Sequence, residues 1–146
     1  MRATQEYRKP LPNVDYDIKP FWDAVRKHQF KLFRCKECGA WYWPVACCRN
    51  HANRPFYGNM EWADASGRGK VFAFNIHRVA FDPAFEDDIP YVYALIELEE
   101  GPIIGSNVIG IGADEVKVGM PLEVVYEDIT EAYTLPKFKP INQGRL

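Results

Sequence analysis

Four cysteines and one histidine gathered in a short stretch provide the clearest chemistry in this sequence. Cys35 and Cys38 are separated by two residues and followed by Gly39, and the same two-residue gap separates Cys48 from His51. Two intervening residues let both donor atoms turn towards one ion, and glycine accommodates the positive φ that such a turn needs. The spacing therefore predicts one tetrahedral zinc ion bound by three cysteines and one histidine.

Cys47 is the remaining thiol, and its position next to Cys48 argues against its joining the same site. Adjacent side chains of an extended or turning backbone point apart, so we expect Cys47 to stay free. Four protein ligands leave no open position for water, which predicts a structural rather than a catalytic ion. The alternatives are inert buried thiols or a redox pair, but a redox pair would open a helix after a strand, and the aromatic run 41–43 follows here instead.

No set of nucleophile, base and orienting group emerges elsewhere in the chain. The segment Ser66–Lys70 lacks the glycine and hydroxyl positions of a phosphate-binding loop, so a tight turn is favoured there. His28 and His77 are isolated, as packing or surface histidines usually are. We therefore expect no active site in this chain, with Cys47 as nucleophile of an independent enzyme as the remaining catalytic alternative.

The elements around the metal motif follow from the polar, apolar and breaker pattern. Residues 1–16 are polar and read as an arm. Residues 17–29 predict a short helix, with Asp17 as its N-cap and Pro20 in its first turn. Apolar and basic positions alternate over residues 30–35, which is typical of a strand.

A different pattern begins at Asn59 and continues to the end of the chain. Aromatic and β-branched runs are separated by Pro and Gly breakers, which predicts five strands over residues 70–81, 91–98, 103–109, 122–127 and 132–135. Five short strands with one helix-like insert at 113–117 favour a small antiparallel barrel. The chain is thus expected to be mainly β, with an arm and helix at 1–29, a metal-binding ribbon at 30–58 and a barrel with a C-terminal tail at 59–146.

Composition excludes some classes of function. The chain has 146 residues, with 18 Lys and Arg against 20 Asp and Glu, and a formal net charge of −2. A general nucleic-acid binder would carry a basic excess. No run is apolar and long enough for a secretory signal or a membrane span, so we expect a cytoplasmic protein that does not associate with membranes and whose cysteines are reduced.

The aromatic side chains near the metal motif exceed what a small ribbon can bury. Phe21, Trp22, Trp41 and Trp43 are the residues concerned. They form either an exposed surface for a partner protein or the packing between ribbon and barrel, and the sequence favours neither.

Several motifs together resemble one known family. They are Pro20-Phe21-Trp22, the run from Phe33 to Gly39, Pro44, Cys48, the run from Ala65 to Val71, Tyr91 and the run from Val118 to Leu122. This series resembles the rubredoxin-like zinc-ribbon plus OB-fold family known as domain of unknown function thirty-five, over about residues 17–140. The departure is His51, where that family usually has a cysteine.

The resemblance implies an accessory subunit without its own catalytic residues. Members of the family are partners of thiolase-fold or lipid-transfer-protein-like enzymes that make or break C–C bonds in acyl-CoA substrates, such as steroid side-chain aldolases and benzoylsuccinyl-CoA thiolase. In such a hetero-oligomer the catalytic groups belong to the partner, and the barrel would help to hold the CoA end of a shared acyl-CoA ligand. Candidate contacts to its phosphates are Arg68, Lys70, Arg78, Lys137 and Lys139. The alternative is a single-strand nucleic-acid module, since ribbons and OB-folds also serve that purpose.

Overall fold

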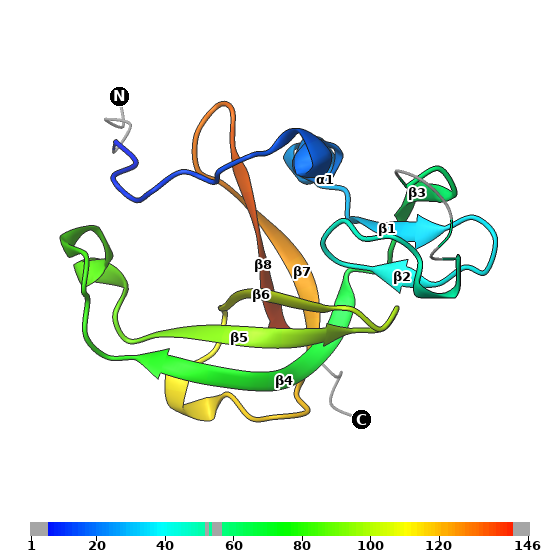
Figure 1. Cartoon of the computed structure of the whole chain (residues 1–146). Coiled ribbons are helices and arrows are strands. Elements are labelled where there is room, and N and C mark those ends of the chain that lie inside the picture. The colour runs from blue at the N-terminus through cyan, green and yellow to red at the C-terminus, as the bar shows by residue number, and fades with distance from the viewer. Residues whose placement is uncertain (1–5, 52, 54–56, 142–146) are drawn as a thin grey trace.

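The described residues form a three-stranded sheet, a closed five-stranded barrel and one α-helix (Figure 1). The computed structural model describes residues 6–51, 53 and 57–141. The small sheet has the order β2-β1-β3, with β1 Lys31–Cys35, β2 Trp41–Tyr42 and β3 Met60–Asp64. The barrel contains β4 Arg68–His77, β5 Tyr91–Leu98, β6 Ile103–Val108, β7 Pro121–Asp128 and β8 Thr134–Pro140. The helix is α1 Lys19–Arg26, and short 3-10 helices are η1 Tyr16–Ile18, η2 Arg49–His51, η3 Pro83–Asp88 and η4 Ala113–Glu115.

The barrel closes because β4 pairs along one edge with β5 and along the other with β7. The strand order β4-β5-β6-β8-β7, with a single parallel contact between β6 and β8, is that of an OB-fold. A shift of register between Val71 and Ala73 bends β4, as a β-bulge does when one strand must serve two partners. The prediction of a mainly β chain with a five-stranded barrel is confirmed.

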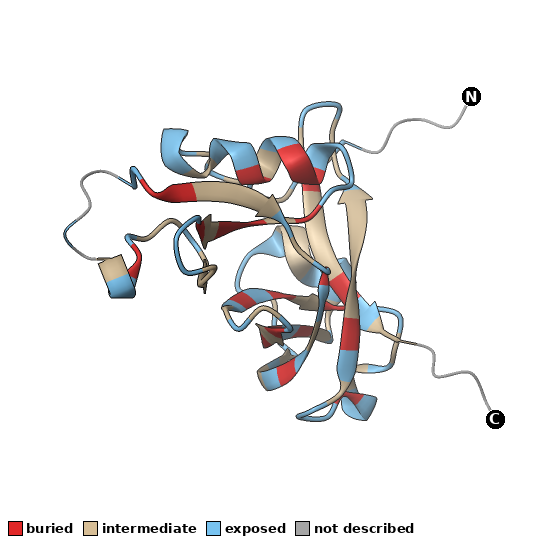
Figure 2. Ribbon diagram, turned by 90° about the vertical axis from the view of Figure 1, so that its right-hand side faces the viewer, coloured by how far each residue is buried: buried red, intermediate tan, exposed pale blue. Residues whose placement is uncertain are grey.

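The barrel core is filled by side chains from alternate strand positions. β5 shows this most clearly, with Val92, Ala94, Ile96 and Leu98 buried and the residues between them partly or fully exposed. Figure 2 shows buried residues as red bands that alternate with partly buried and exposed residues along the barrel strands and helix α1. Phe138 on β8 is fully buried and belongs to this cluster.

Helix α1 begins later than the sequence indicated. Asp17 lies in η1, and the N-cap position of α1 is Ile18, which provides no side-chain hydrogen bond. The Asp17 cap prediction is therefore wrong, because the chain enters the helix through a 3-10 turn that already supplies backbone hydrogen bonds. Pro20 does occupy the first turn, where its missing N–H has no intrahelical partner. Phe21 and Val25 are buried against the barrel.

Strand β3 belongs to the sheet that carries the cysteines. Five residues of β3 pair with β1, from Cys35 opposite Met60 to Lys31 opposite Asp64. The sequence-based boundary at residues 58/59 stays a prediction, and the ends of the outer units, residues 1–5 and 142–146, lie outside the described residues. We propose that the ribbon unit extends to Asp64, because the hydrogen bonds of β3 join it to β1.

Within the described part of the chain, no helix is long and apolar enough to cross a membrane.

Candidate functional site

Cys35, Cys38, Cys48 and His51 converge at one end of the three-stranded sheet. Their ligand atoms all lie within 4.8 Å of one another. The Cys38 and Cys48 sulfurs are 3.5 Å apart, and the Cys35 sulfur is 3.5 Å from Nδ1 of His51. With bonds of ~2.3 Å to sulfur and ~2.0 Å to nitrogen, a tetrahedral zinc ion would place sulfurs about 3.8 Å apart and sulfur and nitrogen about 3.5 Å apart. The donor set therefore fits a single tetrahedral ion.

Local structure explains how these side chains are positioned. Cys35 ends β1, and the Gly39 amide donates to the Cys35 carbonyl over 2.9 Å, closing the first turn with Gly39 at a φ of 74°. Cys48 precedes η2, whose last residue His51 donates its amide to the Cys48 carbonyl over 3.1 Å. Cys35 and Cys38 therefore lie on one tight turn, and Cys48 and His51 lie on another. A spacing of two residues lets both side chains of a pair leave the same side of such a turn.

A second layer of polar groups surrounds the donor atoms. Asn59 donates its side-chain amide to the Cys35 sulfur over 3.3 Å, and Asn50 donates to the Cys38 sulfur over 3.5 Å. The other ring nitrogen of His51, Nε2, lies 3.4 Å from Oε2 of Glu37. A carboxylate on the distal nitrogen fixes the tautomer and orientation of a ligating imidazole, and it raises the basicity of that imidazole.

The thiols differ in how readily they ionise. The Tyr42 hydroxyl, which donates to the Cys48 sulfur over 3.5 Å, is the main cause that lowers the pKa of Cys48 to about 7. The Asn50 amide lowers the pKa of Cys38, whereas burial raises the pKa of Cys35. The hydrogen bonds offset part of the negative charge that three thiolates would carry around a divalent cation.

The arrangement can bind a cation but offers it no free coordination position, because all four tetrahedral ligands come from protein side chains. Cys47 is exposed and is not part of the converging group. The structure thus brings together the four side chains that the sequence spacing predicted as ligands, and Cys47 is not among them.

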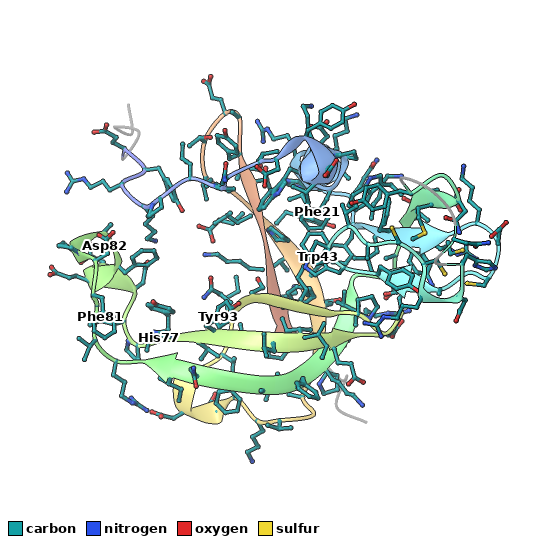
Figure 3. The ribbon with its side chains drawn as sticks, viewed as in Figure 1. Phe21, Trp43, His77, Phe81, Asp82 and Tyr93 are labelled. Atoms are coloured by element: carbon teal, nitrogen blue, oxygen red, sulfur yellow. The ribbon has the colours of Figure 1, made fainter. Side chains whose placement is uncertain are left out.

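The predicted aromatic surface divides into buried and half-buried members. Phe21 is only 1% exposed, and its ring lies 4.3 Å from that of Trp43, centroid to centroid. The prediction that Phe21 contacts a partner protein is therefore wrong, because its side chain packs between α1, the ribbon and the barrel core (Figure 3). Trp22, Trp41 and Trp43 are half-buried, and their role towards a partner stays a prediction.

The five cations predicted to contact CoA each form an ion pair with a carboxylate. The pairs are Arg68–Glu99, Lys70–Glu97, Arg78–Asp114, Lys137–Glu127 and Lys139–Glu123. The barrel register brings some of them together, since Glu123 is the Cα partner of both Arg68 and Lys139. Arg78 lies just beyond the end of β4, and its partner Asp114 belongs to η4 and not to a barrel strand. CoA binding by these side chains stays a prediction.

Two adjacent surface pockets were missed by the sequence reasoning. The larger, of about 340 Å³, lies between the barrel, η3 and the arm. The smaller, of about 250 Å³, lies beside the aromatic junction of Phe21, Trp22 and Trp43. Both include Asn107, Leu135 and Lys137. Both depend on how β6 and β8 meet, and the larger also depends on the arm, an arrangement that no local motif encodes.

Comparisons with known proteins agree with this architecture. A family model described as the C-terminal OB-fold domain of ChsH2 matches residues 62–127. A DUF35 domain-containing scaffold protein of Methanocaldococcus jannaschii is 37% identical over 117 residues, which cover 74% of this chain and 79% of that protein.

Two further relatives are larger proteins or parts of assemblies. A probable enoyl-CoA hydratase alpha subunit of Thermomonospora curvata is 31% identical over 134 residues, and the match covers 90% of this chain but only 40% of that subunit. Among solved structures, a chain of the Ltp2-ChsH2(DUF35) aldolase superposes with a TM-score of 0.76 at 29% identity, covering 89% of this chain and 98% of that one.

Proposed function

Because the chain belongs to the DUF35 family, we propose that it is a non-catalytic subunit of an acyl-CoA enzyme whose catalytic partner has a thiolase or lipid-transfer-protein-like fold. The observation that carries the proposal is the match to a complete chain of the Ltp2-ChsH2(DUF35) aldolase over 98% of its length. The hydratase subunit of T. curvata supports the acyl-CoA class of substrate.

Zinc is the ion that the donor set supports best. Three soft thiolates and an imidazole suit zinc, whereas magnesium and calcium take oxygen ligands. In this proposal zinc supplies no chemistry to the reaction and holds β1, β2 and η2 in one rigid unit. The chain's own residues position the ribbon against α1 and the barrel.

The proposal of a docking surface for the partner is supported by large apolar side chains that are exposed to solvent. Phe81 is 94% exposed and lies on the loop after β4 (Figure 3). Val79 on the same loop is 62% exposed. Tyr93 and Leu95 are exposed on the outer face of β5. Exposed large apolar side chains are typical of a protein interface, and we place the anchor of this surface at Phe81.

The CoA contacts are part of the same proposal. Arg68 and Lys70 point outward from β4, and Lys139 lies across β7 from Arg68. A phosphate of CoA would compete with the carboxylates that now pair with these cations. We therefore expect any CoA affinity of the chain by itself to be weak and to increase when the partner contributes further contacts.

The test is to mix the purified chain with thiolase-fold or lipid-transfer-protein-like enzymes of the same organism and to size each mixture by gel filtration with light scattering. The proposal predicts one hetero-oligomer and an increase in acyl-CoA cleavage activity over the partner alone. Phe81→Ser should weaken the complex, and Tyr16→Ser, which changes another almost fully exposed aromatic residue, should not. Two separate species with unchanged activity would refute the proposal.

A further inference from the structure

The larger pocket lies on the outside of the barrel and has walls of two kinds. One wall is aromatic and comes from Tyr91 at the start of β5 and Phe85 in η3. An aliphatic part of the lining, called the aliphatic wall here, comes from Ile109, Ile111 and Leu135. At about 340 Å³ the pocket falls at the lower end of the range of small-molecule sites, which begins at about 300 Å³. Walls of this kind suit a flat apolar body of one or two rings.

The lining also carries charge, from the ammonium groups of Lys9 and Lys137 and from the carboxylate of Asp88. Lys9 on the arm pairs with Asp88 over 2.5 Å, and its Nζ lies 5.7 Å from the centre of the Phe85 ring. Lys137 on β8 pairs with Glu127 over 2.6 Å, and its side chain is only 16% exposed. An ammonium has three N–H donors, so one carboxylate partner leaves Lys137 able to donate to a second acceptor.

The position of Lys137 is what distinguishes it from its neighbour on the same strand. Lys137 and Lys139 both lie on the outward face of β8, and both pair with a glutamate of β7. Only Lys137 borders the pocket, where Leu135 and Asn107 flank it. A cation with little access to water next to an apolar surface attracts an anion more strongly than one in open solvent.

We propose that this pocket binds a small organic anion, with its ring body between Tyr91, Phe85 and the aliphatic wall and its carboxylate on Lys137. The charge-assisted hydrogen bond to Lys137 gives the preference for an acid, and the apolar walls give the preference for an aromatic body. The site goes beyond the proposed subunit function, because it is complete in this chain and needs no partner.

The experiment is a titration of the full-length zinc-loaded chain with 2-naphthoate, followed by amide shifts in two-dimensional NMR. The neutral analogue 2-naphthamide serves as the matched ligand. Saturable shifts should centre on the amides of residues 107–111, Leu135, Lys137 and Tyr91. Lys137→Met should weaken naphthoate binding about tenfold, the typical effect of a charge-assisted hydrogen bond, and should change naphthamide binding by less than about twofold.

Two further variants sharpen the result. Lys139→Met removes the neighbouring ion pair outside the pocket and should leave both affinities unchanged. Ala113→Phe adds a ring to the lining of this pocket alone and should abolish binding of both ligands, with a circular dichroism spectrum like that of the parent. Absence of saturable binding, equal effects of the two lysine variants, or shifts centred on the tryptophan junction would each overturn the proposal.

Discussion

Phe21 links the three parts of the molecule, and truncating it is the sharpest test of how the ribbon is held on the barrel. The side chain is 1% exposed, and its ring contacts those of Trp43, Trp22 and Phe30, with centroids 4.3, 5.5 and 5.9 Å away. Removing a buried phenyl ring costs about 3–5 kcal/mol, because its transfer free energy is lost and a cavity remains. For a domain of this size we expect a fall in melting temperature of about 10–15 °C for Phe21→Ala.

The assay is chemical and thermal unfolding of the zinc-loaded protein, followed by tryptophan fluorescence and far-UV circular dichroism. Phe72→Ala provides the control, since Phe72 is a phenylalanine of β4 that is 51% exposed, and its loss should cost less than about 0.5 kcal/mol. If Phe21→Ala cost less than about 1 kcal/mol, or no more than the control, the ribbon and barrel would not share a core through this residue.

Three further changes follow from single contacts. Tyr42→Phe removes the hydroxyl that donates to Cys48 and should lower zinc affinity about 10–100-fold in a competition with a chelator. Gly69→Ala would place a Cβ 2.5 Å from a backbone carbonyl oxygen of β5 and should destabilise the barrel by at least about 2 kcal/mol in urea unfolding. The pKa of Asp128 is lowered mainly by the hydrogen bond from the Thr134 hydroxyl and next by the one from His28. The ionised carboxylate therefore stabilises the fold above the unfolded pKa of Asp128, and this stabilisation is lost as the pH falls through the folded pKa. Asp128→Asn should be less stable than the parent at pH 7, with the difference in unfolding free energy shrinking towards pH 3.

Each of these results has a control or a contrary outcome. Tyr16→Phe changes a hydroxyl on an exposed ring and should leave zinc affinity unchanged. Gly112→Ala places its Cβ no closer than 3.6 Å to another group and should be tolerated. A difference between Asp128→Asn and the parent that stayed constant from pH 7 to pH 3 would contradict the linkage argument.

The parts of the structure that local patterns encode were predictable. The two-residue spacing selected Cys35, Cys38, Cys48 and His51 correctly as a converging group, because each pair lies within one turn. The barrel strands were recognisable because breakers separate aromatic and β-branched runs. Four of the five lie close to the predicted ranges, whereas β8 shares only Thr134 and Leu135 with the predicted range 132–135.

The features that sequence could not provide depend on contacts between distant segments. The pairing of Met60–Asp64 with β1 depends on tertiary register, so nothing in the sequence indicated that this strand joins the sheet of the ribbon. An apolar residue such as Phe21 looks the same in the sequence whether it contacts a partner protein or packs in the core, so its burial could not be predicted. Lys137 gives no sign in the sequence that it borders a pocket, since its surroundings come from β6, η3 and the arm.

The central proposal is that one zinc ion, bound by three sulfurs and one imidazole, stabilises the ribbon of this subunit. In the same proposal the catalytic residues belong to the partner enzyme. Zinc-edge X-ray absorption of the purified protein tests the metal part of this claim directly. We predict one zinc per chain with three sulfur neighbours at ~2.3 Å and one nitrogen at ~2.0 Å. A shell of four sulfurs, a shell containing water oxygen, or zinc well below one per chain would contradict the claim.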